Sequence, residues 1–172
     1  MRKIRYLVAT SLDGFIAGPK GECDWIGTDP EVDFAGIWEQ FDTCVMGRRT
    51  YKVAVERLGE KAFRNVATVV FSRTMKPADH PRATVVSALT QGWVRELKGK
   101  PGKDIWLMGG GELFRAFLDA GFVDTVEVSV IPVLLGDGVP LLPFPYHPTK
   151  LKLISNTIYR SGRVALAYEV GR

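Results

Sequence analysis

Hydrophobic and polar positions follow one another along this chain with two different periods. Short apolar runs rich in β-branched residues, each bounded by turn residues, are typical of buried strands. They occur at residues 4–10, 42–46, 66–71, 83–86, 105–108 and 122–133. Between several of these runs, apolar residues recur three and four positions apart, which predicts helices at residues 30–41, from Thr50 onward, at 89–97 and at 113–118. The first helix is expected to follow Asp29 and Pro30, an N-cap and a proline at the first helical position.

The order of these elements predicts the architecture. Strands that alternate with helices form largely parallel sheets that are covered on both faces. Residues 151–159 and 164–170 flank Ser161 and Gly162 without an intervening helix, which predicts an antiparallel hairpin. We therefore expect one α/β domain over residues 1–172, with three layers (α/β/α), a mostly parallel central sheet and an antiparallel C-terminal hairpin.

Composition excludes several classes of protein. The formal net charge of +4 arises from 23 basic and 19 acidic residues that are scattered along the chain, whereas nucleic-acid binders need a concentrated basic face. No apolar run reaches the roughly 20 residues of a membrane span. Cys23 and Cys44 lack the spacing of a zinc site or a disulfide framework. We expect a cytoplasmic protein with a small-molecule substrate and without nucleic acid, membrane or metal.

Three consecutive glycines after the strand at 105–108 are the first candidate for a binding site. Gly109, Gly110 and Gly111 stand directly before a helical pattern. Glycine lets the backbone approach a diphosphate closely, and the free N–H groups at the start of a helix favour an anion. A tight strand-to-helix turn would need the same glycines for its geometry alone, and the run by itself does not decide between these interpretations.

A second strand ends in a similar way, at Gly47. Arg48 and Arg49 follow it, and a helix is expected to begin at Thr50. Cations are disfavoured near the positive end of a helix dipole. Two arginines at this place therefore favour an anionic ligand, which they can bind through charge-assisted hydrogen bonds, over a merely solvated pair.

Five motifs in one order resemble the dihydrofolate reductase superfamily. They lie at residues 11–18, 45–51, 70–73, 108–113 and 129–138. The chain is most similar to the branch that contains the reductase domain of bifunctional riboflavin-biosynthesis proteins and many stand-alone relatives. The resemblance spans nearly the whole chain, and it implies a dihydrofolate reductase-like fold and an NADPH-dependent reductase.

The resemblance also implies which residues bind the cofactor. Those matched to the phosphates and the adenine end of NADPH are Gly47, Arg48, Arg49, Thr50, Ser72 and Arg73. Those matched to the loop over the diphosphate are Gly109, Gly110, Gly111, Glu112 and Leu113, with a cis peptide expected between the first two. Those matched to the nicotinamide side are Ala9, Ile16 and Ala17, and residues 13–25 match a mobile flap over that ring. Because Arg48 would face the adenosine 2′-phosphate, we expect NADPH rather than NADH.

Three carboxylates are candidates for a catalytic acid. Hydride transfer to an imine or a conjugated C=N must be followed by a proton, from a carboxylate or from water. Dihydrofolate reductases place one carboxylate on the helix after the flap, and Glu31 and Asp33 both lie near that place. Either would equally serve as a first-turn acid that complements the helix dipole. Asp13 is the third candidate, although we favour for it an Asx turn that shapes the flap before Gly14.

Together these features predict a reductase that transfers hydride from NADPH to a pterin-like or ribosylaminopyrimidine-like small molecule, of the riboflavin-pathway type. Classical folate reduction is disfavoured because the carboxylate position is ambiguous. A kinase-like site is disfavoured because the chain contains no G-x-x-x-x-G-K-[ST] sequence. The main alternative is a protein of the same fold that binds the dinucleotide without catalysing a reaction.

A homodimer is also expected, since relatives in this branch are commonly dimers. The apolar residues 133–135 and 139–142 flank a turn and offer a contact surface. Packing in the core would explain the same residues.

Overall fold

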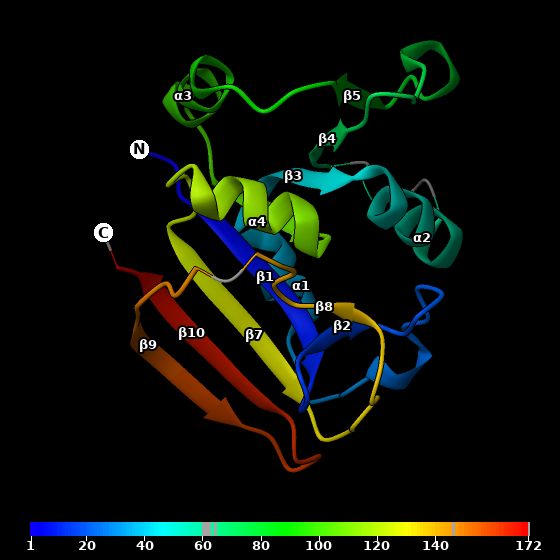
Figure 1. Cartoon of the computed structure of the whole chain (residues 1–172), viewed down its shortest axis with the longest axis vertical. Coiled ribbons are helices and arrows are strands. Elements are labelled where there is room, and N and C mark those ends of the chain that lie inside the picture. The colour runs from blue at the N-terminus through cyan, green and yellow to red at the C-terminus, as the bar shows by residue number, and fades with distance from the viewer. Residues whose placement is uncertain (60–62, 64, 146, 172) are drawn as a thin grey trace.

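A central eight-stranded sheet organises the computed structural model of the chain, which describes residues 1–59, 63, 65–145 and 147–171 (Figure 1). The strands run in the order β5-β4-β3-β6-β1-β7-β10-β9. The parallel strands are β1 (Ile4–Ser11), β3 (Phe41–Gly47), β4 (Ala67–Phe71), β5 (Ala83–Val86), β6 (Asp104–Gly109) and β7 (Thr125–Ile131). The antiparallel hairpin consists of β9 (Leu151–Ile158) and β10 (Val164–Val170), and β10 pairs with β7. The predicted mixed sheet is confirmed.

Helices cover both faces of this sheet. The helices on one face are α3 (Gln91–Gly99) and α4 (Gly111–Asp119), and those on the other are α1 (Phe34–Glu39) and α2 (Arg48–Leu58). Figure 1 shows α4 in front of β1 and α1 behind it. Phe114 and Phe117 of α4 pack in the main core, whereas Trp38 of α1 and Tyr51 of α2 pack against a smaller cluster on the opposite face. The expected three layers are therefore present.

The central strands form the core because they are buried on both faces. Ile4, Tyr6 and Leu107 expose none of their surface on one face, and Cys44 and Met46 expose none on the other. Such strands show as continuous apolar runs in the sequence. Burial raises the pKa of the Cys44 thiol to about 12, so this cysteine stays neutral and serves as a small core residue.

The first helix is shorter than the sequence pattern predicted. α1 begins at Phe34 instead of residue 30, and Asp33 is its N-cap, whose carboxylate accepts a backbone hydrogen bond at 2.9 Å. The Asp29 carboxylate accepts instead from the Glu31 N–H at 3.0 Å and from the Ser161 hydroxyl at 2.5 Å. The prediction that Asp29 and Pro30 open the helix was wrong, because the β9–β10 turn binds the Asp29 side chain.

The bounds of other helices and strands differ from the sequence prediction by two to three residues. α2 begins at Arg48 instead of Thr50, with Gly47 as its N-cap. α3 covers 91–99 instead of 89–97 because the side chain of Thr90 caps it, and β7 ends at Ile131, just before Pro132. Two further strands pair only with each other, β2 (Phe15–Ala17) and β8 (Val139–Pro140).

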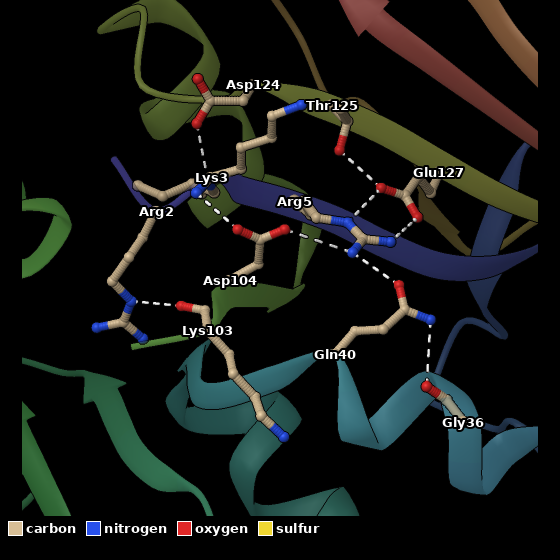
Figure 2. Close-up of polar contacts among 11 residues, drawn as sticks. Arg2, Lys3, Arg5, Gly36, Gln40, Lys103, Asp104, Asp124, Thr125 and Glu127 are labelled. Atoms are coloured by element: carbon tan, nitrogen blue, oxygen red, sulfur yellow. Dashed lines mark hydrogen bonds and ion pairs between the residues drawn. The ribbon is translucent and has the colours of Figure 1, made fainter. Parts of the chain in front are cut away.

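A polar network ties together β1, β7 and the end of α1 (Figure 2). Arg5 donates two hydrogen bonds to the Glu127 carboxylate, both at 2.7 Å, and one to Gln40 at 2.8 Å. Asp104 lies 3.5 Å from the same guanidinium. The hydrogen bonds to Glu127 raise the pKa of Arg5 above its usual value. Because these charges are paired with one another, the network stabilises the strands by holding them in register.

Within the described ranges, no helix has the length and apolar character needed to span a bilayer.

Candidate cofactor-binding site

Three turns meet at the carboxyl edge of the sheet. They follow β3, β4 and β6, which are adjacent in the order β4-β3-β6. A Cβ atom placed on Gly47 would lie 3.9 Å from the carbonyl oxygen of Gly109 and 4.0 Å from the nitrogen of Gly110. Arg48 donates a hydrogen bond to the hydroxyl of Thr74 at 2.9 Å, which joins the first turn to the second. The sequence motifs that were matched to the phosphates of a dinucleotide are therefore neighbours in space.

The glycine turn after β6 has the backbone that the resemblance implied. The peptide between Gly109 and Gly110 is cis, as expected, and Gly109 has φ +111°, in the left-handed region that favours glycine. The first backbone hydrogen bond of α4 runs from the Phe114 N–H to the Gly110 carbonyl at 3.0 Å. The N–H groups of the first helical residues before it have no partner within the helix, so they are available to an anion.

Gly111 is required for a different reason. A Cβ atom at this position would lie 2.6 Å from the Pro140 carbonyl oxygen and 3.0 Å from Cδ of Pro143. The segment after β8 therefore packs directly against the start of α4. Gly111 is therefore required by close packing against a distant segment, whereas a Cβ atom on Gly47 or Gly110 would meet no atom closer than 3.7 Å.

Replacing Gly111 with alanine should therefore destabilise the fold. We expect Gly111→Ala to lower the free energy of unfolding by about 1–3 kcal/mol, because the added methyl group would have to displace backbone. Urea unfolding followed by circular dichroism measures this. Gly99→Ala is the matched control, since a Cβ there meets no atom within 4 Å. Equal free energies of unfolding for the two variants would contradict the close packing of the Pro140 segment against Gly111.

Three arginines follow the carboxyl ends of β3 and β4. Arg48 and Arg49 are the first two residues of α2 and are exposed, as is Arg73 after β4. None of the ion pairs found among the described residues involves any of these three arginines. Ser72 accepts hydrogen bonds from the backbone of Thr74 and orders the loop that carries Arg73. This part of the edge is therefore positively charged and suited to an anionic group.

The other matched residues differ in what their side chains do. Glu112 is exposed in the first turn of α4, where an acid complements the helix dipole. Leu113 packs against the core, so only its backbone can face a ligand. Thr50 lies beside the glycine turn, with its hydroxyl 3.7 Å from a Cβ built on Gly110.

The residues matched to the nicotinamide side lie around the end of β1. Ala9 is in β1 next to Ser129 of β7, and Ile16 and Ala17 are in β2, which pairs with β8. The Ser11 hydroxyl accepts the Phe15 N–H at 2.9 Å and thereby turns the chain from β1 into β2. These residues share the edge at which the three turns meet.

Asp13 holds two loops together. Its carboxylate accepts hydrogen bonds from the Gly136 N–H at 2.7 Å and the Ser11 hydroxyl at 2.6 Å, and from the Leu135 N–H. The Ser11 hydroxyl, followed by the Gly136 N–H, holds the pKa of Asp13 below its usual value. An ionised, fully engaged carboxylate fits the role of a loop anchor. It does not form the Asx turn that we favoured from the sequence, because the Phe15 N–H donates to the Ser11 hydroxyl instead.

The other two candidate acids are also engaged by neighbours. Glu31 accepts a hydrogen bond from the Arg160 N–H at 2.9 Å and lies 3.2 Å from its Nε. It stands outside α1, so its interpretation as a first-turn acid was wrong, because the helix begins later. Asp33 is the N-cap of α1, where its charge complements the dipole.

Sequence reasoning missed a clamp between residues 26–29, directly after the flap, and the C-terminal hairpin. Asp29 and Arg163 are 6% and 5% exposed, and their side chains lie 3.8 Å apart. Arg163 also donates to the Ile26 carbonyl at 3.1 Å, and Ser161 donates to Asp29. The two halves of the clamp are more than 130 residues apart in the chain, and no local motif marks them. The segment directly after the flap is thus fixed to the end of the hairpin at which β9 and β10 are joined.

This clamp should make the free energy of unfolding depend on pH. The Ser161 hydroxyl, followed by the Glu31 N–H, lowers the pKa of Asp29. The ionised carboxylate therefore stabilises the fold above about pH 4, and this contribution is lost as the pH falls through the folded-state pKa. We expect Asp29→Asn to unfold at a lower urea concentration than the wild type at pH 7. The difference between the two urea midpoints should become smaller in strong acid. The exposed Asp79→Asn is the control; a pH-independent difference for Asp29→Asn would contradict the prediction.

The described residues contain no group of three or more histidine, cysteine, aspartate or glutamate side chains arranged to hold a metal ion.

Comparison with known proteins identifies the family. Residues 2–166 match the model of the RibD C-terminal domain. The uncharacterized protein YyaP of Bacillus subtilis is 33% identical over 178 residues, which cover 97% of this chain and 94% of the relative. The riboflavin biosynthesis protein RibD of Corynebacterium ammoniagenes is 26% identical, over 82% of this chain but only 46% of its own length.

Solved structures agree with this result. A putative riboflavin biosynthesis protein from Shewanella sp. PV-4 superposes with a TM-score of 0.84 at 26% identity, with both chains fully covered. A bifunctional deaminase and 5-amino-6-(5-phosphoribosylamino)uracil reductase from Thermotoga maritima shares the fold over 57% of its length, with a TM-score of 0.72 at 17% identity. The chain belongs to the RibD C-terminal domain family, and its fold is that of the RibD-like, dihydrofolate reductase-like proteins.

Proposed function

We propose that the protein is an NADPH-dependent reductase that transfers hydride to a pterin-like or ribosylaminopyrimidine-like molecule. Membership of a family of reductase domains supports the general class. The finer proposal rests on one observation, the proximity of the turn at Gly47–Arg49 to the glycine turn, since a Cβ atom built on Gly47 would lie within 4.0 Å of the Gly109–Gly110 peptide. We place the protein in the cytoplasm, where its free thiols would stay reduced.

The residues present fit a dinucleotide phosphate. The missing side chain of Gly47 leaves space for one methyl group beside the backbone of the glycine turn, and α2 and α4, whose first N–H groups have no partner within the helix, begin directly after these two turns. Arg48 and Arg73 would bind the 2′-phosphate through charge-assisted hydrogen bonds. NADPH, when bound, supplies the hydride.

The protein would contribute to this reaction mainly by positioning the cofactor and the acceptor. Hydride transfer requires the donor and acceptor carbons roughly 3–3.5 Å apart, with water excluded. Ala9 and Ala17, being small, would let the nicotinamide lie against the end of β1, and Asp13 would fix the loops beside it. Because Asp13, Glu31 and Asp33 are each held by structural hydrogen bonds, we propose that the proton reaches the acceptor from water.

A titration of nicotinamide fluorescence tests the cofactor. We expect saturable binding of NADPH with at least tenfold weaker binding of NADH, because NADH lacks the phosphate that the arginines would contact. NADPH oxidation is then measured with a panel of pterins and ribosylaminopyrimidines. Absence of NADPH binding would overturn the proposal.

The alternative is a dinucleotide-binding protein without catalytic activity. The engagement of all three candidate acids in structural contacts favours it. NADPH binding without oxidation by any acceptor in the panel would support this alternative, whereas oxidation by one acceptor would exclude it.

A further inference from the structure

The central sheet splits between β1 and β6 at its carboxyl edge. The two strands pair only as far as Tyr6 and Leu107, although β1 continues to Ser11 and β6 to Gly109. Beyond that point β1 stays paired with β7, and β6 stays paired with β3. The last residues of β1 and β6 are therefore neighbours in the strand order that do not pair with each other.

The geometry of β6 explains why the strands separate. The pairing of β6 with β3 shifts by one residue between Val45 and Met46, and Met108 is the residue of β6 that is passed over. Gly109 follows with φ +111°. An extra residue of this kind bends a strand and interrupts its pairing. The end of β6 is thus turned away from β1 before the glycine turn begins.

A side chain replaces the first ladder bond that the split removes. In the paired part of the two strands, the Ile105 N–H donates to the Lys3 carbonyl at 2.8 Å. A regular ladder continued along both strands would join the Gly109 N–H to the Leu7 carbonyl in the same way. The pairing ends before that bond, and the indole N–H of Trp106 donates to the Leu7 carbonyl instead, at 2.8 Å.

The Trp106 ring is fixed by aromatic neighbours. Its centroid lies 4.7 Å from that of Trp38 in α1 and 5.2 Å from that of Phe41 in β3. A half-buried carbonyl must find a donor, because leaving it unpaired is costly. With the indole in place, the Leu7 carbonyl needs neither a water molecule nor the Gly109 N–H, so the split persists.

We propose that Trp106 is a positioning residue that keeps this split open for the nicotinamide ring, an inference that rests on the proposed binding of NADPH. Ala9, which was matched to the nicotinamide side, is two residues beyond Leu7 in β1. Its backbone N–H and carbonyl therefore point to the same side of the strand, toward β6, where no strand residue pairs with it. A planar ring in the split would lie between this open backbone and the glycine turn.

Loss of the indole N–H would affect one half of the dinucleotide. The Leu7 carbonyl would then accept a hydrogen bond from water, which would occupy the split, or from the Gly109 N–H, which would narrow it. Both changes act where the nicotinamide is expected. Arg48 and Arg73, which we propose for the 2′-phosphate, follow β3 and β4 and would be unaffected.

Calorimetric titration of Trp106→Phe with two ligands tests the proposal. NADPH carries the nicotinamide, whereas adenosine 2′,5′-bisphosphate carries only the adenosine and its phosphates. We expect the dissociation constant to rise by about tenfold or more for NADPH and to stay within about twofold for the bisphosphate. Trp93→Phe is the matched control, because Trp93 is also half-buried and packs on a phenylalanine, in α3; it should change neither affinity.

A second variant carries 3-benzothienylalanine at position 106. Its ring has nearly the shape of indole, with sulfur in place of the N–H, so the packing against Trp38 and Phe41 is kept and only the donor is lost. The same selective weakening of NADPH is expected, and circular dichroism verifies the fold of each variant.

The outcomes separate this inference from the proposed function. Unchanged NADPH affinity in either folded variant, or equal weakening of both ligands, would overturn the role of Trp106 while the binding of NADPH by the wild type still stood. A wild type that binds neither ligand would overturn the proposed function, and the role of Trp106 with it.

Discussion

Gly47→Ala should abolish tight binding of NADPH while leaving the fold intact. The added methyl group would occupy the gap between Gly47 and the Gly109–Gly110 peptide, where protein atoms lie 3.9 Å or more away. A phosphate that contacts both turns, as proposed, would lie beside this gap and would be pushed away by the methyl group. We expect the dissociation constant for NADPH to rise by about 100-fold or more, since the phosphate would lose its contacts with both helix starts.

Stability distinguishes this effect from misfolding. Alanine is a poorer N-cap than glycine, so a loss of up to about 1 kcal/mol is expected from α2. Gly92→Ala is the matched control, because a Cβ at Gly92 meets no atom within 4 Å and lies on α3. Unchanged NADPH affinity in a folded Gly47→Ala protein would show that the phosphates do not lie between these turns.

Arg48→Ala should reduce the preference for NADPH over NADH. Hydrogen bonds to charged groups contribute about 1.5–3 kcal/mol, so we expect NADPH affinity to fall about 10- to 100-fold. The affinity for NADH should change little, because NADH has no 2′-phosphate. Fluorescence titration with both dinucleotides measures the ratio.

Arg95→Ala, an exposed arginine on α3, controls for the loss of one positive charge. Equal weakening of NADPH and NADH by Arg48→Ala would mean that Arg48 acts through its hydrogen bond to Thr74 and orders the loop after β4. In that case Arg73 and Arg49 would be the residues to replace next.

The regular part of the fold could be predicted because its signals are local. β1, β3, β4, β6 and the hairpin were predicted to within a few residues, since buried strands show as apolar runs bounded by glycine, proline or polar turns. The convergence of the turns at one edge followed from the parallel order of the strands. The cis peptide came from family resemblance, and no local pattern would have indicated it.

The errors arose where distant contacts decide local structure. Asp29 and Pro30 have the form of a helix start, but Ser161 and Arg163 bind the Asp29 carboxylate, and the helix begins at Phe34, four residues later than predicted. Likewise, Gly111 belongs to a glycine run that looks uniform in sequence, yet only the approach of Pro140 gives it a separate role. Neither partner can be inferred from neighbouring residues.

The clamp between residues 26–29 and the hairpin also determines when this part of the chain can fold during synthesis. Asp29 lies near the beginning of the chain and Ser161 near its end, 132 residues later. Residues 26–29 cannot be fixed until the hairpin of β9 and β10 has been synthesised and has emerged from the ribosome. If the nicotinamide lies beside this segment as proposed, that side of the site takes its final geometry only after the hairpin has folded.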